Sequence, residues 1–327
     1  MSSNERDSFF LFSVDDAAKP LKYLYDQAKM SYWVAEDIDM SQDLLQWNKL
    51  SPELQRFLIY VLAFFFVSDG VVFENLVFRF AQEVSNDAKP FYAIQIAMEM
   101  IHAETYSKFI EVLVTDRVTR DHLTRTVEEF SCVQKKMRWA AKWFASDKSF
   151  ATRLLAFVAV EGIFFSGSFC AIFYLRTKPY YLRGLRQANE YIARDEGLHC
   201  RFACEYYKQL EPLPVSEVYG IIKEAVFIEK EFFDEALAVP VIGMNKEMMA
   251  DHIKYVADYW LQELGYPRLY NVEEPFDFMN LIALQGKTNF FERRPTEYSK
   301  GNIAPGGSTG LVEIGTGENV LNVVNLD

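Results

Sequence analysis

Two four-residue sequence motifs with the same pattern, Glu-x-x-His, constrain this chain more than any other feature; they are called words below. They are Glu99-Met-Ile-His102 and Glu196-Gly-Leu-His199, and they contain two of the four histidines in the 327-residue sequence. On an α-helix, residues i and i+3 share a face, so each word directs a carboxylate and an imidazole to one point. One such word is weak evidence, but two of them within apolar helical stretches predict a two-metal site in the core of a four-helix bundle.

Two further carboxylates complete such a site. Asp69 and Glu161 each lie in a stretch that is otherwise apolar and helical in pattern. The result is four carboxylates and two imidazoles from four helices, a ligand set that suits iron or manganese better than zinc or copper. Four carboxylates also balance the charge of two divalent ions, which offsets much of the cost of burying them. Taken singly, Asp69 equally fits a surface position, and Glu161 equally fits a polar cavity.

Two residues close to the paired Glu-x-x-His words are also candidates for a chemical role. Tyr106 lies four residues after His102, one turn further along the same face. It is either a core tyrosine with a bonded hydroxyl or a one-electron donor to an oxidised metal pair. Asp195 points about 100° around the helix from Glu196, where it can accept the second ring N–H of a ligand histidine.

The periodicity of the chain predicts an all-α fold. No run alternates as a strand would, and the first forty residues have no clear pattern. Residues 154–175 are long and apolar enough to cross a membrane, but Glu161 in their first half favours a helix buried in protein. We expect helices over these residues: 51–84, 91–115, 121–145, 149–175, 180–210, 215–237 and 246–264.

Composition narrows the functional classes and the organisation of the protein. A net charge of −12 argues against a general nucleic-acid binder. Four cysteines without a Cys-x-x-Cys pattern indicate reduced thiols in a cytoplasmic protein, and the first residues do not form an apolar signal segment. We expect a helical domain over residues 1–285 and a flexible tail over 286–327, because residues 301–327 are rich in glycine and lack aromatics.

At these residues the chain resembles the small, radical-generating subunit of class I ribonucleotide reductase, in its eukaryotic and viral branch. The similarity runs from about residue 10 to about residue 300 and implies a ferritin-like helical bundle with a buried di-metal carboxylate site. The matching segments are residues 66–76, 95–102, 160–169, 193–200, 275–279 and 286–292. The resemblance implies that one metal is held by Asp69, Glu99 and His102. The other metal would be held by Glu161, Glu196 and His199.

The resemblance also assigns a radical and a route to it. Tyr106 matches the position of the stable tyrosyl radical of the family. Trp33 and Asp195 match the residues that connect the metal site with the surface through hydrogen bonds to His102. Two iron ions would reduce O₂ with one extra electron supplied through Trp33, and Tyr106 would then be oxidised. A manganese–iron or di-manganese cofactor stays possible, because both metals accept the same ligands; a tyrosine at position 106 favours iron.

The resemblance also assigns residues that shield the radical and residues that contact partner proteins. Phe165 and Phe169 match the apolar wall around the radical, and Tyr298 matches the tail tyrosine that passes the radical to the large subunit. The family works as a homodimer that docks on the large subunit through its C-terminal tail, in the cytoplasm (the host cytoplasm for a viral member). Ribonucleotides would become deoxyribonucleotides on that partner. Consistently, this sequence shows no glycine-rich phosphate loop.

Two departures and two alternatives accompany this interpretation. The tail ends Asn322-Val-Val-Asn-Leu-Asp327 without an aromatic anchor, and only a short segment precedes the region of similarity, which leans toward a viral or microbial source.

A stand-alone ferritin-like di-metal oxidase or oxygenase would share the six ligands, but it would not need Tyr106, Trp33 and Tyr298 together. A metal-free structural or membrane helical protein would leave both Glu-x-x-His words unexplained.

Overall fold

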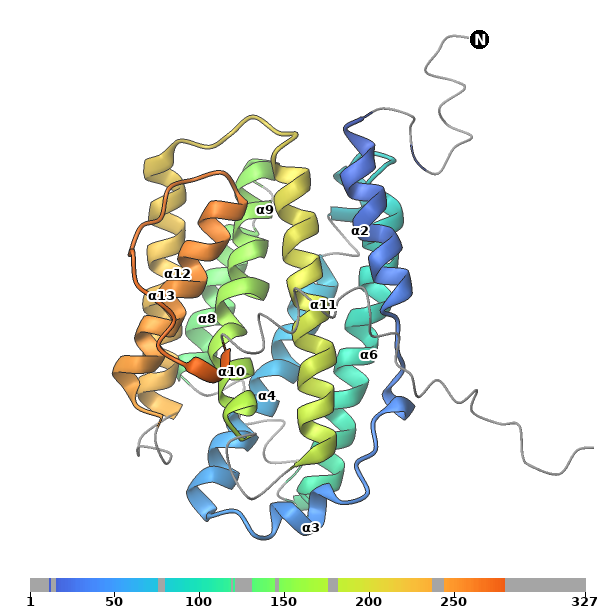
Figure 1. The fold of residues 1–327 in the computed structure, drawn as a ribbon, viewed down its shortest axis with the longest axis vertical. Coiled ribbons are helices and arrows are strands. Elements are labelled where there is room, and N and C mark those ends of the chain that lie inside the picture. The colour runs from blue at the N-terminus through green and yellow to red at the C-terminus, as the bar shows by residue number, and fades with distance from the viewer. Residues whose placement is uncertain are drawn as a thin grey trace, which may run out of the picture.

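A computed structural model of the protein describes most of its first 279 residues. The described residues are 12, 16–75, 80–118, 120, 131–144, 147–175, 182–236 and 244–279. Every element of regular structure within these ranges is helical (Figure 1). The all-α prediction is therefore confirmed.

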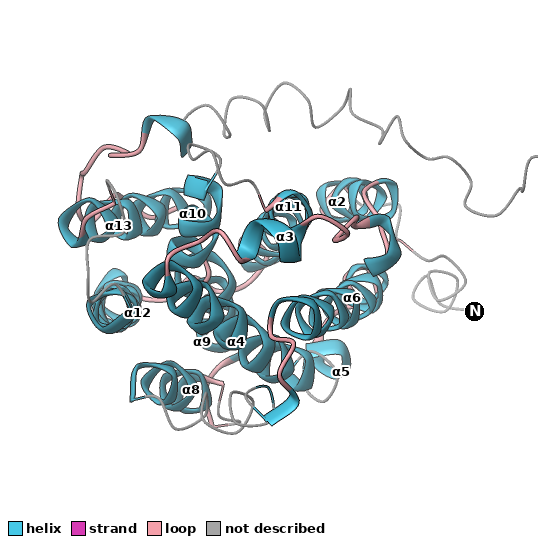
Figure 2. Ribbon diagram, turned by 90° about the horizontal axis from the view of Figure 1, so that it is seen from below, coloured by secondary structure: helices cyan, strands magenta, loops and turns pink. Residues whose placement is uncertain are grey.

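The inner helices of the bundle are those that carry the predicted ligands, together with the two helices that flank the turn of Glu161. In the end-on view they occupy the middle of the molecule and the side next to α2 (Figure 2). Helix α4 packs along α6, and α11 packs against α9 and η5. These inner elements are α4 (Pro52–Asn75), α6 (Lys89–Leu113), α9 (Phe150–Ala159), η5 (Val160–Phe164), α10 (Ser166–Tyr174) and α11 (Arg183–Tyr207).

An outer set of helices covers this centre. Helix α2 packs on α6 and α11, while α12 packs on α13, α8 and η5. The outer elements are α2 (Ala18–Met30), α8 (Ser131–Trp143), α12 (Val215–Ala236) and α13 (Lys246–Glu263), with the short η2 (Ala35–Asp37), α3 (Asp43–Trp47) and α5 (Ala81–Glu83). Helix α2 lies within the first forty residues, for which the sequence pattern predicts no helix. Its buried Leu21, Leu24 and Ala28 nevertheless follow helical spacing.

The apolar stretch that imitates a membrane span is a core element. Among the described residues, Phe150–Tyr174 forms the one helical segment long and apolar enough to cross a membrane, and the apolar window within it is entirely buried in the protein. Neighbouring helices on several sides supply the apolar surroundings that a lipid bilayer would otherwise provide. The stretch is thus the central helix of the bundle, as Glu161 indicated.

The prediction of a helix over 149–175 is confirmed, but the helix is not regular along its whole length. The turn formed by Val160–Phe164 is π-helical, and it separates α9 from α10. Such a widened turn loosens the regular ladder of backbone hydrogen bonds and is often found at functional sites. Here it contains Glu161, so the irregular turn is the one that presents a buried carboxylate.

One neighbouring side chain and two from distant helices satisfy the carbonyl groups of this turn. Three successive carbonyl oxygens accept hydrogen bonds: Gly162 from Trp260 Nε1 at 3.3 Å, Ile163 from Ser166 Oγ at 2.8 Å, and Phe164 from Lys136 Nζ at 3.1 Å. Any larger residue at Gly162 would collide with the indole of Trp260. The π turn is therefore fixed by tertiary contacts that a local pattern does not contain.

The start of α11 is also fixed from a distance. Both carboxylate oxygens of Asp43, the first residue of α3, accept backbone N–H groups at the first turn of α11, from Gly184 and Leu185, each at 2.9 Å. These bonds satisfy donors that a helix N-terminus otherwise leaves open. They set where α11, and with it the word Glu196 to His199, begins.

Candidate metal centre

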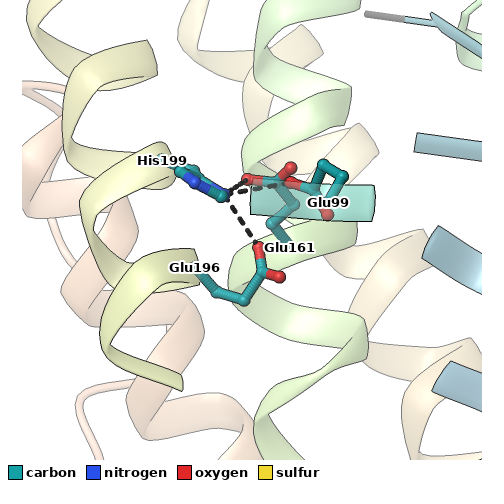
Figure 3. A group of neighbouring side chains, drawn as sticks. All are labelled: Glu99, Glu161, Glu196 and His199. Carbon is teal, nitrogen blue, oxygen red and sulfur yellow. Dashed lines mark hydrogen bonds and ion pairs between the residues drawn. The ribbon is translucent and has the colours of Figure 1, made fainter. Parts of the chain in front are cut away.

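Four of the predicted ligands meet at one point inside the bundle. Ligand atoms of Glu99, Glu161, Glu196 and His199 all lie within 4.8 Å of one another, and all four residues are buried. They come from α6, η5 and α11, and their side chains converge (Figure 3). The i, i+3 spacing of the second word therefore acts as predicted, with both members on one face of α11.

The imidazole of the first word joins the same group. His102 Nδ1 lies 3.1 Å from Glu196 Oε1 and 3.5 Å from Glu99 Oε2. On the other side, His199 Nδ1 lies 3.1 Å from Glu99 Oε1. Both histidines thus turn the same ring nitrogen toward the carboxylates. The sixth predicted ligand, Asp69, belongs to α4, but its side chain lies outside the described part of the structure.

The arrangement of these atoms fits metal ligands. Glu99 Oε2, Glu196 Oε1 and His102 Nδ1 are buried and have no partner in hydrogen-bonding geometry among the described residues. Yet His102 Nδ1 lies only 3.1 to 3.5 Å from the two carboxylate oxygens. Two atoms that bind one ion at right angles, each about 2.1 Å from it, lie about 3 Å apart. The oxygen-rich donor set matches iron or manganese.

The electrostatics show that the cluster attracts positive charge. Burial opposes charging of either imidazole, but Asp195 and Glu196 beside His102 outweigh it, and so do Glu196 and Glu99 beside His199. The pKa values of both histidines are raised. Burial likewise favours the neutral form of Glu99, but the two imidazoles outweigh it and lower the pKa of that carboxyl. Without metal, protons on the two histidines offset part of the charge of the carboxylates, and metal binding must release these protons.

Gln95 is a buried polar residue of the centre that the sequence reasoning missed. Its side-chain amide donates to Glu161 Oε1 at 3.1 Å and approaches Glu99 Oε1 at 3.5 Å. The signal was present, because Gln95 lies one turn before Glu99 on the same face of α6. The amide fixes the orientation of two carboxylates that arrive from different helices.

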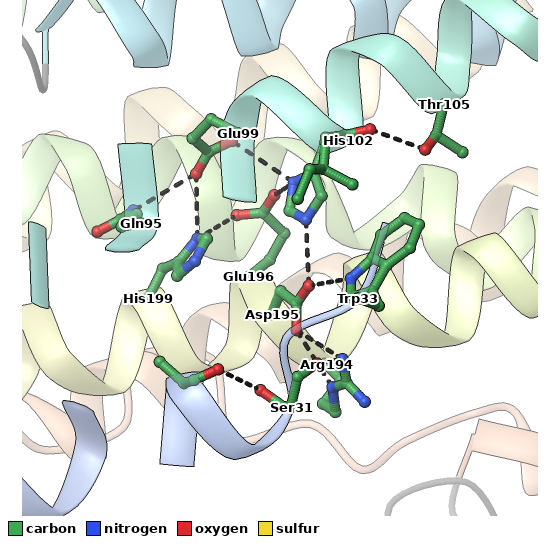
Figure 4. A network of polar contacts seen from close by, with 12 residues as sticks. Ser31, Trp33, Gln95, Glu99, His102, Thr105, Arg194, Asp195, Glu196 and His199 are labelled. Carbon is green, nitrogen blue, oxygen red and sulfur yellow. Dashed lines mark hydrogen bonds and ion pairs between the residues drawn. The ribbon is translucent and has the colours of Figure 1, made fainter. Parts of the chain in front are cut away.

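A hydrogen-bonded path leads from the centre toward the surface, as expected for Trp33 and Asp195. His102 Nε2 lies 3.2 Å from Asp195 Oδ2, and the same oxygen accepts the indole N–H of Trp33 at 2.7 Å (Figure 4). Arg194 donates to the other oxygen of Asp195 at 3.0 Å and to the Ser31 carbonyl at 2.7 Å. Asp195 thereby places a proton on Nε2 of His102 and leaves Nδ1 for a metal.

Tyr106 lies inside an aromatic group of which the sequence named only a part. Its ring is 3% exposed and stacks on Phe65, with centroids 4.9 Å apart. Phe169 stacks on the same Phe65 at 4.9 Å, and Phe165 meets it edge-on at 5.4 Å. Phe65 therefore packs between Tyr106 and the predicted wall of Phe165 and Phe169. Tyr298 and residues 286–327 lie outside the described residues.

Comparison with known proteins agrees with this geometry. The family described as "Ribonucleotide reductase, small chain" matches residues 15–275. A ribonucleoside-diphosphate reductase small subunit of Arabidopsis thaliana is 46% identical over 310 residues, which cover 93% of the present sequence and 88% of the plant protein. The corresponding protein of Variola virus is 50% identical over 288 residues, which cover 86% and 90% of the two sequences.

A solved structure gives the same result for the fold. The ribonucleotide reductase Rnr4 homodimer from Saccharomyces cerevisiae superimposes with a TM-score of 0.76 at 30% identity, covering 85% of the present protein and 88% of the yeast one. The family match includes every described element that contributes to the buried carboxylate and histidine cluster. The chain therefore belongs to the small-chain family of ribonucleotide reductase and is the small subunit of a ribonucleoside-diphosphate reductase.

Proposed function

We propose that the buried centre binds two iron ions and uses O₂ to form a stable radical on Tyr106. The observation that carries this proposal is the convergence of five predicted ligands on one buried point, with Tyr106 one turn beyond His102 on α6. Glu99 and His102 would hold one metal together with Asp69. Glu161, Glu196 and His199 would hold the other.

The protein itself would supply a donor and a protected environment. When bound, the metal pair supplies the power to oxidise a phenol by one electron after reaction with O₂. Tyr106 would give up an electron and its hydroxyl proton and become a neutral radical. The rings of Phe65, Phe165 and Phe169 keep water and small reductants away from it, because the group is almost wholly buried.

The path through Trp33 and Asp195 would carry electrons between surface and centre. Its three members are joined by contacts of 2.7 and 3.2 Å, and the rings of Trp33 and His102 lie 6.0 Å apart in a stacked arrangement. Asp195 also stabilises positive charge on either ring, since it is a buried carboxylate. One extra electron for oxygen reduction would enter by this route.

The partner of a small chain is the large, catalytic subunit. We propose that two copies of this protein form a homodimer, as in the yeast structure, and that residues 286–327 dock on the large subunit in the cytoplasm. Tyr298 in that segment would pass the radical onward. The large subunit would then reduce ribonucleoside diphosphates.

Electron paramagnetic resonance on the Tyr106→Phe variant tests this proposal. Metal-free protein is loaded with ferrous iron in air, and iron is counted in parallel. We expect about two irons per chain in both proteins, a persistent tyrosyl signal in the wild type only, and loss of reductase activity in the variant. Tyr92→Phe is the matched control, because Tyr92 is another fully buried tyrosine on α6, and it should keep the signal.

Two results would contradict the proposal. Iron uptake by the wild type without any radical would favour a stand-alone oxidase or a manganese-containing cofactor. Full reductase activity in Tyr106→Phe would mean that the oxidising equivalent is stored on the metals.

A further inference from the structure

We propose that Tyr191 is the outermost residue of the Trp33 electron route. In this role it reduces oxidised Trp33 and is restored at the surface by a one-electron reductant such as ferrous ion. The inference rests on the proposed function, because it extends the path that delivers the extra electron. It assigns a redox role to a tyrosine that none of the ligand words or motifs pointed to.

Three rings follow one another from the buried centre outward. The ring of Trp33 stacks on that of His102, with centroids 6.0 Å apart. The ring of Trp33 also contacts that of Tyr191, with centroids 5.4 Å apart and an interplanar angle of 59°. His102 is fully buried and Trp33 is 5% exposed, while Tyr191 is only half-buried. Rings in such contact exchange electrons readily, so the series joins the metal centre to solvent.

The spacing on α11 explains why Tyr191 reaches this position. Tyr191 precedes Asp195 by four residues, so both lie on the face of α11 that meets Trp33. Asp195 binds the indole N–H at 2.7 Å, which fixes the ring, and Tyr191 packs on that fixed ring one turn earlier. The contact is therefore held in place by a buried hydrogen bond.

The surroundings of Tyr191 suit transfer rather than storage of a radical. Gln187 Nε2 donates to the phenol oxygen at 3.1 Å, and the side chain of Tyr191 is only half-buried, so its ring is accessible to solvent. The guanidinium of Arg194 lies over the ring at 5.2 Å and favours loss of the phenolic proton when the ring is oxidised. Tyr106 is 3% exposed and stacks on Phe65 instead, so a radical on Tyr191 meets solvent while one on Tyr106 does not.

The electron balance of the step is simple. Trp33, having given one electron toward the metal centre, is a cation radical. Tyr191 returns one electron to it, releases its hydroxyl proton to water and becomes a neutral radical. A ferrous ion in solution then gives one electron and becomes ferric, and the radical takes up a proton to restore the phenol.

Freeze-quench electron paramagnetic resonance can locate this radical. The Tyr106→Phe background removes the stable signal, and ferrous iron with O₂ is added without other reductant. We expect a transient tyrosyl signal that changes when ring-deuterated tyrosine is incorporated. In Tyr106→Phe/Tyr191→Phe that signal should be lost, and a tryptophan radical that responds to deuterated tryptophan should live longer.

Two control variants make the result specific. Tyr219 is also half-buried and belongs to α12, a helix on the opposite side of the molecule from α2 (Figure 2). Tyr219→Phe in the same background should therefore keep the transient signal. Tyr32 precedes Trp33 in the sequence and is 40% exposed, which makes it the natural competitor. Phenylalanine at position 191 preserves the ring packing, so a purely structural role would leave every signal unchanged.

The outcomes separate this inference from the proposed function. A transient tyrosyl signal that persists in the Tyr191→Phe background, or that is lost with Tyr32→Phe instead, overturns the inference while the Tyr106 radical of the wild type stands. A wild-type protein that binds iron and forms no radical overturns both. Loss of the signal with Tyr191→Phe alone supports the route.

Discussion

Two groups of buried charges reach the π-helical turn η5, and they differ in how their charges are matched. The metal centre brings Glu161 of η5 together with the carboxylates of Glu99 and Glu196 and with two imidazoles, those of His102 and His199. Nearer the other end of the turn, Lys136 binds the carbonyl of Phe164 and forms a 2.5 Å ion pair with Glu229. The first group contains an excess of carboxylates, whereas the second is a one-to-one pair.

The surroundings of the pair stabilise the charge of its ammonium group. Both side chains are buried, and the ammonium of Lys136 also lies over the rings of Phe64 and Phe232, at 3.6 and 3.8 Å. Burial raises the pKa of Glu229 to about 7, although Lys136 partly offsets this. Matched buried charge holds a fold in one arrangement, while unmatched buried carboxylate reserves a place for cations. The predictions below test this contrast, from the largest effect to the smallest.

Removing a charge from the metal centre should abolish chemistry but not folding. We expect Glu196→Gln to bind less iron and to form no radical, because Glu196 contacts both His102 and His199. Wild-type protein should gain about 2.7 kcal/mol from ferrous iron at a hundredfold excess over its dissociation constant, and the variant should gain much less. Thermal unfolding with and without iron measures this; an equal gain in both proteins would contradict a ligand role.

Removing a charge from the Lys136–Glu229 pair should destabilise the fold but leave iron binding intact. We expect Lys136→Met to lower the free energy of unfolding of the metal-free protein by about 3 kcal/mol, because it leaves Glu229 buried without its partner. Folded variant should still take up iron. Denaturant titration gives the free energy, and a loss no larger than that of Glu196→Gln would remove the contrast between the two groups.

A neighbouring pair provides the matched control for this prediction. Lys135 and Glu231 lie 3.0 Å apart but are about one-third exposed, so Lys135→Met should cost less than about 1 kcal/mol. The double variant Lys136→Met/Glu229→Leu should recover part of the loss, since it removes both charges together. A double variant as unstable as the sum of its two single changes would show that the pair does not act as a unit.

The smallest expected effect is a pH dependence of the metal-free protein. Carboxylates raise the pKa of His199 from 6.5 to about 9 against the opposing effect of burial. The protonated form is favoured by folding, so its contribution to stability is full below pH 6.5 and is lost as the pH rises through about 9. Iron should flatten this decline, because metal-bound imidazoles are already unprotonated. Parallel melting curves against pH with and without iron would contradict this.

The sequence alone predicted the parts of this protein that depend on local spacing. The i, i+3 words place Glu99 with His102 and Glu196 with His199, since a helix fixes which side chains share a face. The apolar stretch with one carboxylate was correctly assigned to the core. Helix α2 was missed although Leu21, Leu24 and Ala28 follow helical spacing, because its surface residues obscure the pattern.

Only the tertiary structure decided what distant segments do to one another. The π turn at Glu161 exists because Trp260, Ser166 and Lys136 satisfy its carbonyl groups, and two of these donors come from helices distant in sequence. The contact between Tyr191 and Trp33 joins residues that are far apart in the sequence. Spacing along one helix determines a face, but which faces meet depends on packing, and packing is a property of the whole fold.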